Sequence, residues 1–237
     1  MTQSPIGARR LYRGAAGRTM RGMTDALPPV PAAAAAQLDD QTVHVWHLGY
    51  RRAAGRRPLR RLLAAYLGFD AGVLELTQDA HGRPRLDPRH GAVLDFNWSH
   101  SGDHALVAIA RGIAPGVDVE RRRAQPRALE LARRYFDAAE ATALAALPEG
   151  ARDEAFLALW TAKEALLKAH GRGIGYGLQR LRVAAPPQPL RLLRFDGEDI
   201  DAWQLQPLHV VPELVAALAW RGAPREVRVA PALADIE

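Results

Sequence analysis

The chain has 237 residues, of which 48% are apolar, with a formal net charge of +6 and no cysteine. This size supports one large core or two small ones, and the lack of cysteine excludes disulfides and thiolate metal sites. No apolar stretch approaches the roughly 20 residues of a membrane helix, so we expect a soluble protein with no membrane partner. The lack of cysteine favours a reducing compartment, and we expect the protein to be cytoplasmic. The positive charge favours an acidic partner: nucleic acid, a phosphorylated small molecule or an acidic protein.

Residues 1–40 are rich in Ala, Pro, Gly and Arg without a sustained apolar period, which predicts a disordered or poorly packed leader. The leader lacks the apolar core of a secretory signal, and Met20 or Met23 could be the true start. Beyond it, alternation at 42–48 predicts a half-buried strand and helical spacing at 56–69 predicts a helix. We expect further strands, with turns between them, at 73–78, 104–111 and 117–120.

The second part of the chain repeats this order loosely. Helices are expected near 127–136 and 153–169, the second ended by the glycines of "HGRGIGYG". Short strands are expected at 181–184, 190–195, 203–208 and 214–220. Helices interspersed with short strands predict an α+β fold, with an N-terminal half at 41–117 and a C-terminal half at 118–230.

Two acids lie on one face of the strand at 117–120. Residues two apart in a strand share a face, so Asp118 and Glu120 point the same way while Val117 and Val119 face the core. Two adjacent carboxylates repel each other unless a cation lies between them, and a hard divalent ion is the usual solution. The alternative is a solvated strand end balanced by the "RRR" that follows.

The helix at 153–169 carries the chain's only two lysines, Lys163 and Lys168. In a chain otherwise supplied with arginine, these lysines indicate a need for a compact ammonium group. Glu164 and Lys168 are four apart and share a helix face. The alternatives are chance placement and an ordinary surface Glu–Lys pair.

The segment "NWSHSG" places Ser99 and His100 before a glycine turn, where a hydroxyl and an imidazole can donate to phosphate oxygens. A hydrolase is the alternative, but the sequence has no G-x-S-x-G elbow. It also has no G-x-x-x-x-G-K-[ST] phosphate loop, no H-E-x-x-H helix and no dinucleotide turn.

Together "FNWSHSG", "GVDVER" and "WTAKEALLKAHGRG" resemble, in order and spacing, the three motifs of Sfp-type 4'-phosphopantetheinyl transferases. The resemblance covers about residues 43–229. It implies two similar α+β halves packed pseudo-symmetrically, with coenzyme A between them. It also implies Mg²⁺-dependent transfer of 4'-phosphopantetheine from coenzyme A to a serine of an acidic acyl or peptidyl carrier protein, releasing 3',5'-ADP. We expect a monomer.

The resemblance also implies residue roles. The implied magnesium ligands are Asp118, Glu120 and Glu164, and Glu164 or Glu140 is the implied base. Coenzyme A contacts are implied for Arg83, Ser99, His100, Lys163 and Lys168. The basic segment before the first helix is shorter than in the family, so Arg56, Arg57 and Arg60 are substitutes by position only.

Three rival functions remain at this stage. A basic nucleic-acid-binding module is opposed by the lack of a basic stripe with exposed aromatics, zinc spacing or a helix-turn-helix pattern. An inactive homologue that only binds carrier proteins is opposed by the intact acidic triad. A phosphodiesterase using the same metal-binding acids has less support.

Overall fold

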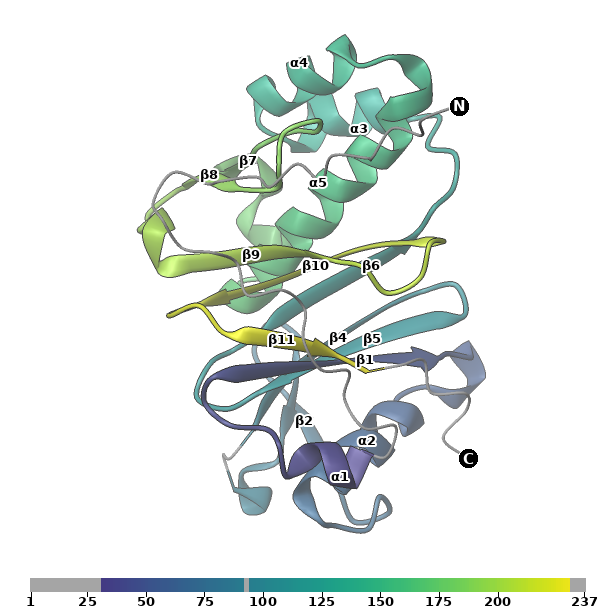
Figure 1. The fold of residues 1–237 in the computed structure, drawn as a ribbon, viewed down its shortest axis with the longest axis vertical. Helices are drawn as coiled ribbons and strands as arrows, with labels where there is room; N and C mark the ends of the chain where they lie inside the picture. Colours follow the sequence, from purple (N-terminus) through teal and green to yellow (C-terminus); the bar gives the residue numbers. More distant parts are fainter. Residues whose placement is uncertain (1–30, 92–93, 231–237) are drawn as a thin grey trace, which may run out of the picture.

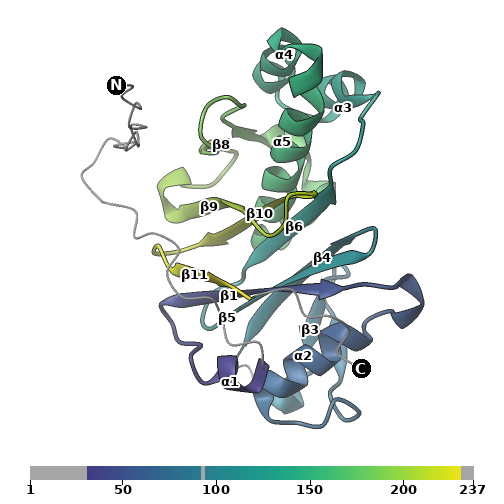
Figure 2. The same cartoon turned by 45° about the vertical axis from the view of Figure 1, so that its right-hand side comes forward.

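The computed structural model describes residues 31–91 and 94–230 as four stacked layers: helices, sheet, sheet, helices (Figures 1 and 2). The helices are α1 Pro31–Ala35, α2 Arg57–Leu67, α3 Ala128–Tyr135, α4 Ala138–Ala146 and α5 Glu149–His170. The strands are β1 Thr42–Gly49, β2 Leu76–Gln78, β3 Pro84–Leu86, β4 Asp95–Ser101, β5 His104–Ala110, β6 Gly116–Arg121, β7 Leu181–Val183, β8 Leu192–Phe195, β9 Trp203–Leu208, β10 Leu214–Arg221 and β11 Glu226–Val229.

The first sheet has the strand order β11-β1-β5-β4 and is covered on its outer face by α2. Leu59, Leu62, Leu63 and Tyr66 of α2 follow helical spacing and are all buried against this sheet. Gly68 ends the helix in the left-handed conformation, with φ of 71°. Strand β11 comes from the far end of the described chain and pairs in parallel with β1.

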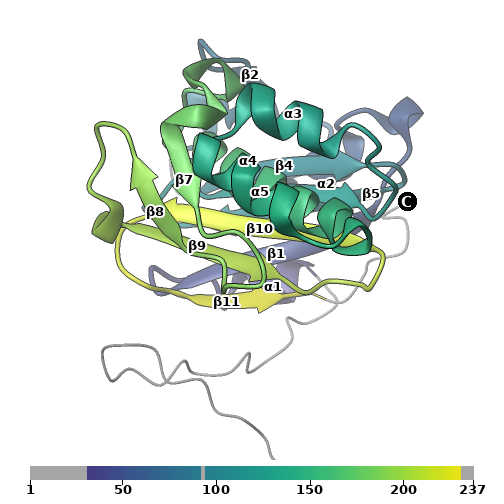
Figure 3. The same cartoon turned by 90° about the horizontal axis from the view of Figure 1, so that it is seen from above.

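The second sheet has the order β6-β10-β9, and α5 packs across its outer face with α3 and α4 beside it (Figure 3). The contact between β6 and α5 depends on Gly116. A Cβ atom at this position would collide with the backbone of Ala165 and Ala169. Glycine therefore allows the strand that carries the acids to lie directly against the helix that carries Glu164 and Lys168.

The two sheets face each other across a shared apolar layer. Val43 and Val45 of the first sheet meet Val117, Leu218 and Trp220 of the second. The predicted strand at 42–48 is confirmed, but the expectation that it is half-buried is wrong, because α2 covers one face and the second sheet covers the other. None of the described helices combines the length and apolar character needed to span a membrane.

The predicted α+β class is confirmed, and the predicted strands and helices correspond to elements of the structure. Most of the predicted leader, residues 1–30, lies outside the described residues. Its last part is ordered, since α1 is helical and Ala34 and Leu38 are buried. The predicted boundary between residues 117 and 118 falls inside β6, and β11 joins the sheet of the first half, so the proposed division crosses both sheets.

Candidate functional site at the seam between the halves

The candidate site lies where β4 of the first sheet runs beside β6 of the second (Figure 2). The backbone of β4 pairs with β5, and that of β6 pairs with β10. Side chains connect β4 to β6: the Asn97 side-chain oxygen accepts from the Val117 backbone N–H at 2.9 Å. Farther along the strand, Ser99 and Ser101 reach the two acids of β6.

Asp118 is buried, with 6% of its surface exposed, and one of its carboxylate oxygens accepts two hydrogen bonds from the protein. Its Oδ1 accepts from Ser99 Oγ at 2.7 Å and from Lys168 Nζ at 2.6 Å. Its Oδ2 is buried without a hydrogen-bond partner among the described residues. A buried, partnerless carboxylate oxygen is costly unless a cation or proton donor satisfies it, so Oδ2 is free to accept such a partner.

Glu120 and Glu164 complete a group of three carboxylates. Glu120 Oε2 accepts from Ser101 Oγ at 2.8 Å, and burial raises the Glu120 pKa. Burial, then the charges of Asp118 and Glu120, raise the pKa of Glu164 to about 7. Glu164 Oε1 is also buried without a partner in the described part of the chain. The three acids repel one another, which is the electrostatic condition that a bound cation relieves.

Lys168 neutralises part of this charge. Its ammonium group donates to Asp118 Oδ1 and, at 3.1 Å, to the carbonyl of Val117. An ammonium has three donors, so one N–H of Lys168 has no acceptor among these two groups. The side chain is 23% exposed and remains open to an incoming anion.

Lys163, the other lysine of α5, does not lie at the seam. Its side chain is 0% exposed and donates to Glu140 at 2.6 Å, to the Leu178 carbonyl at 2.9 Å and to the Leu181 carbonyl at 2.6 Å. These three acceptors use all three donors of the ammonium. Lys163 therefore cannot contact a coenzyme phosphate in this structure, and we leave it out of the proposed site.

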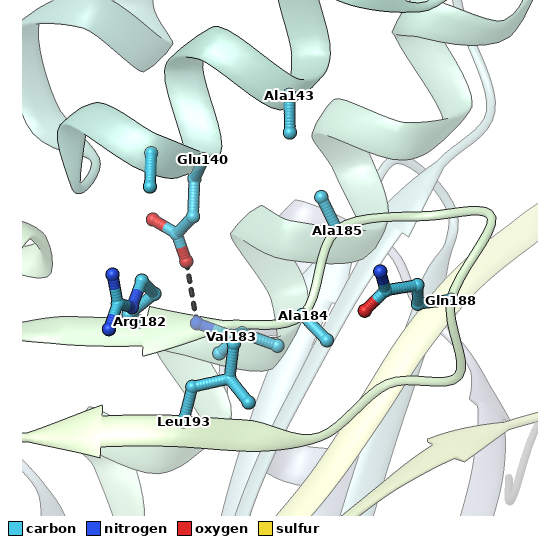
Figure 4. Close-up of a pocket in the computed structure, with 9 residues that line it drawn as sticks. Glu140, Ala143, Arg182, Val183, Ala184, Ala185, Gln188 and Leu193 are labelled. Carbon is cyan, nitrogen blue, oxygen red and sulfur yellow. Dashed lines mark hydrogen bonds between the residues drawn. The ribbon is translucent and has the colours of Figure 1, made fainter.

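Glu140 is fixed in the same buried contact. It closes the capping box of α4 by accepting from the Asp137 N–H, and its other oxygen accepts from the Val183 N–H at 2.7 Å (Figure 4). The hollow of about 210 Å³ beside it, between α4 and the β7–β8 hairpin, includes none of the three site carboxylates. The expected role of Glu140 as a base is thus replaced by a structural one.

Arg83 was expected near the nucleotide but is 8% exposed and bonded to the protein. Its guanidinium donates to the carbonyls of Lys168, Phe96 and Pro115 and to Asp95. These bonds tie the end of α5 to the first half. Because its terminal nitrogens are already used on the protein, we leave Arg83 out of the ligand contacts.

The remaining expected residues lie on the first half. His100 is exposed and stacks on Tyr50 with ring centroids 4.4 Å apart, while burial and the nearby Lys168 and Arg52 lower its pKa. Arg56 is partly exposed, and Arg60 donates to the Leu74 carbonyl at 3.0 Å. His100 is therefore the expected phosphate contact that the structure leaves most open to a ligand.

As the side chains are placed in residues 31–91 and 94–230, no group of three or more His, Cys, Asp or Glu could hold a metal ion. Lys168 already occupies one Asp118 oxygen, and the carboxylates repel one another. Their partnerless buried oxygens are hard donors of the kind that Mg²⁺ prefers. The donor chemistry at the seam therefore fits a magnesium ion.

Comparisons with known proteins identify the family. A model described as the 4'-phosphopantetheinyl transferase superfamily matches residues 114–219. The 4'-phosphopantetheinyl transferase HetI of Nostoc is 36% identical over 73% of this chain and 71% of its own length. The chain belongs to the 4'-phosphopantetheinyl transferase superfamily. This membership, predicted from the three motifs, is confirmed.

Two further matches are partial. The putative 4'-phosphopantetheinyl transferase slr0495 of Synechocystis is 36% identical over 65% of this chain, which spans 63% of that relative. A holo-[acyl-carrier-protein] synthase structure from Thermotoga maritima is 19% identical and covers 46% of this chain and 62% of its own, with a TM-score of 0.37. That structural similarity is too low to support an argument, so the superfamily assignment rests on the sequence relatives.

Sequence reasoning missed Asn97, Ser101 and Tyr50 as members of the seam. The signal for the first two was the alternation of polar residues in "NWSHS", which places Asn97, Ser99 and Ser101 on one strand face. Nothing in the sequence indicated which strand that face would meet. The stacking of Tyr50 on His100 likewise depends on β5, which pairs with β1 on one side and with β4 on the other.

Proposed function

We propose that this chain transfers 4'-phosphopantetheine from coenzyme A to a serine of an acyl or peptidyl carrier protein, releasing 3',5'-ADP. The observation that carries the proposal is the convergence of Asp118, Glu120 and Glu164 beside Lys168 at the seam, in a chain of this superfamily. Polyanionic coenzyme A requires cationic groups to offset its charge, and the partly exposed Lys168 at the seam supports the proposal.

We assign the magnesium site to Asp118, Glu120 and Glu164. The partnerless oxygens of Asp118 and Glu164 support this assignment, since a hard cation would satisfy them and relieve the repulsion that raises the Glu164 pKa. Bound magnesium would neutralise the pyrophosphate and polarise its phosphorus towards attack.

The residues of the chain supply the other elements of the reaction. The spare N–H of Lys168 and the exposed ring of His100 would bind phosphate oxygens and stabilise the charge that develops on the departing 3',5'-ADP. Glu164, or a water that it orients, would accept the proton of the carrier's serine, because its Oε1 is buried without a hydrogen-bond partner among the described residues.

The net charge of +6 supports an acidic carrier as the partner, and we propose that the protein acts as a monomer. The absence of cysteine fits the reducing conditions of the cytoplasm, where we propose that it works.

Mass spectrometry of an apo-carrier protein incubated with coenzyme A, Mg²⁺ and this protein tests the proposal. The expected result is a gain of one phosphopantetheine group on the carrier's serine, which is lost in excess chelator. Replacement of that serine by alanine in the carrier is the control. An unmodified carrier across acyl and peptidyl types would favour the inactive, carrier-binding homologue.

A further inference from the structure

We propose that Ser101 is a positioning residue that holds Glu120 in the metal site from the opposite sheet, and that Ser99 does the same for Asp118. The inference rests on the proposed function and deepens it. It also changes the role of the serine–histidine–serine segment, from which a phosphate contact by Ser99 was expected. In this assignment only His100 of the segment faces the coenzyme.

The spacing of the two strands carries the proposal. Ser99 and Ser101 are two residues apart on β4, and their partners Asp118 and Glu120 are two residues apart on β6. The two hydrogen bonds, of 2.7 and 2.8 Å, therefore form successive rungs between strands that belong to different sheets. Side-chain rungs replace the backbone ladder that these strands lack, and they set the position of both acids.

The hydrogen-bonding capacity of each serine is committed to this task. A serine hydroxyl has one donor. The donor of Ser101 goes to Glu120, while its oxygen accepts from the Arg121 N–H at 3.2 Å, which fixes the direction of the hydroxyl. Ser99 and Ser101 are 7% and 8% exposed. Neither can donate to a phosphate without releasing its carboxylate.

Ser101 opposes a second partner of Glu120. Arg123 approaches Glu120 Oε2 at 3.6 Å, and its side chain is 63% exposed. Without the hydroxyl of Ser101, Arg123 is the cation that remains beside this oxygen and can draw the carboxylate towards solvent. The rotamer freedom of glutamate makes such an anchor more important for Glu120 than for the shorter Asp118.

The proposal is tested by titrating Mn²⁺ into the full chain with coenzyme A present, following free Mn²⁺ by electron paramagnetic resonance. Ser101→Ala should weaken Mn²⁺ binding about tenfold, as the loss of an orienting partner usually does. Ser101→Thr, which keeps the hydroxyl, should restore most of the affinity. In transfer assays Ser101→Ala should lower kcat with little change in the carrier KM.

Thr42→Ala is the matched control. Thr42 is buried and donates to the carboxylate of Asp39 at 2.8 Å, which is the same interaction outside the site. Its loss should leave Mn²⁺ affinity unchanged. In addition, Arg123→Gln should improve Mn²⁺ binding more in the Ser101→Ala background than in the wild type, because only there does Arg123 compete unopposed.

The outcomes separate the inference from the proposed function. No Mn²⁺ binding by the wild type would overturn the metal site itself. Wild-type binding that Ser101→Ala leaves unchanged would overturn the positioning role alone. Loss of cooperative unfolding in Ser101→Ala, without recovery of Mn²⁺ affinity by Ser101→Thr or by Arg123→Gln, would assign the serine a purely structural role and would also overturn it.

Discussion

Lys163 and Lys168 lie five residues apart on α5, yet the two ends of this short stretch serve different parts of the molecule. Lys163 is 0% exposed and meets three acceptors on the side of α4 and β7. Lys168 is 23% exposed and faces the three acids at the seam. One ammonium is saturated by the fold, whereas the other keeps a donor for a ligand.

The comparison shows that a rare residue type can be required for two unrelated reasons. A planar guanidinium cannot replace a compact group surrounded by three acceptors, so Lys163 is needed for packing. At Lys168 the same compactness allows a point charge beside Asp118. Composition singled out both lysines, but only the environment of each distinguishes the structural one from the functional one.

The largest effect is expected from breaking the buried pair. Lys163→Met should lower the free energy of unfolding by about 3–5 kcal/mol, because Glu140 is left buried without its cation. Chemical denaturation measures this change. The double variant Lys163→Met, Glu140→Gln should recover part of the loss, and the coenzyme A KM of folded Lys163→Met should stay near that of the wild type. A large rise in that KM would return Lys163 to the ligand site.

Removing the open lysine should affect turnover instead. Lys168→Ala should reduce kcat about 100- to 1000-fold, since it removes a charge from the departing group. Its free energy of unfolding should change by no more than about 3 kcal/mol, the upper end of the range for a hydrogen bond between charged groups. Lys168→Arg is the graded comparison and should remain impaired. Full activity of the arginine variant would show that a compact ammonium is not required there.

His44 is also buried but, unlike the two lysines, it is not paired with a carboxylate. Trp46 donates to the Tyr66 oxygen at 2.7 Å, so the Tyr66 hydroxyl can donate to Nδ1 of a neutral His44 at 2.8 Å. Burial lowers the His44 pKa from 6.5 to about 4. Between these pKa values His44 is protonated in the unfolded chain but not in the folded one. The free energy of unfolding should therefore fall by about 3 kcal/mol as pH drops from 6.5 to 4. Unfolding of wild type and His44→Gln across this range measures the difference, which should be smaller in the variant.

The smallest effect is expected from salt, which should change carrier binding but not the stability of the buried Lys163–Glu140 pair. Raising ionic strength from about 0.05 to 0.3 M should increase the carrier KM a few-fold, because exposed charges are screened. The contribution of the Lys163–Glu140 pair to stability should hardly change. The coenzyme A KM is measured alongside, since its phosphates are screened too. A carrier KM that stays flat would show that the basic surface does not guide docking.

The sequence predicted those features that depend on local periodicity. The strand of Asp118 and Glu120 and the helix of Glu164 and Lys168 could be placed from spacing alone. The pairing of Lys163 with Glu140 could not, because it depends on how α4 packs against α5.

Arg83 and Ser101 show the same limit. A coenzyme A contact was implied for Arg83, and no role was predicted for Ser101. Both side chains instead bind protein groups that the packing of one half on the other brings close. Periodicity indicates which face a side chain occupies, but not which distant element will cover that face. Among the implied roles, the structure argues against those of Lys163, Glu140 and Arg83, whose polar groups are already bound to the protein, whereas the metal-ligand role of the acids stays a prediction.

Strand β11 has a consequence for the order in which the molecule forms. It pairs in parallel with β1, with Thr42 opposite Glu226, so this pairing cannot form until almost the whole described chain has left the ribosome. Pairing across such a sequence separation is slow, since a long loop must close before the contact contributes. Until then one edge of β1 is open to other chains. Vulnerability to aggregation during synthesis should therefore be concentrated at the first half, although that half is translated first.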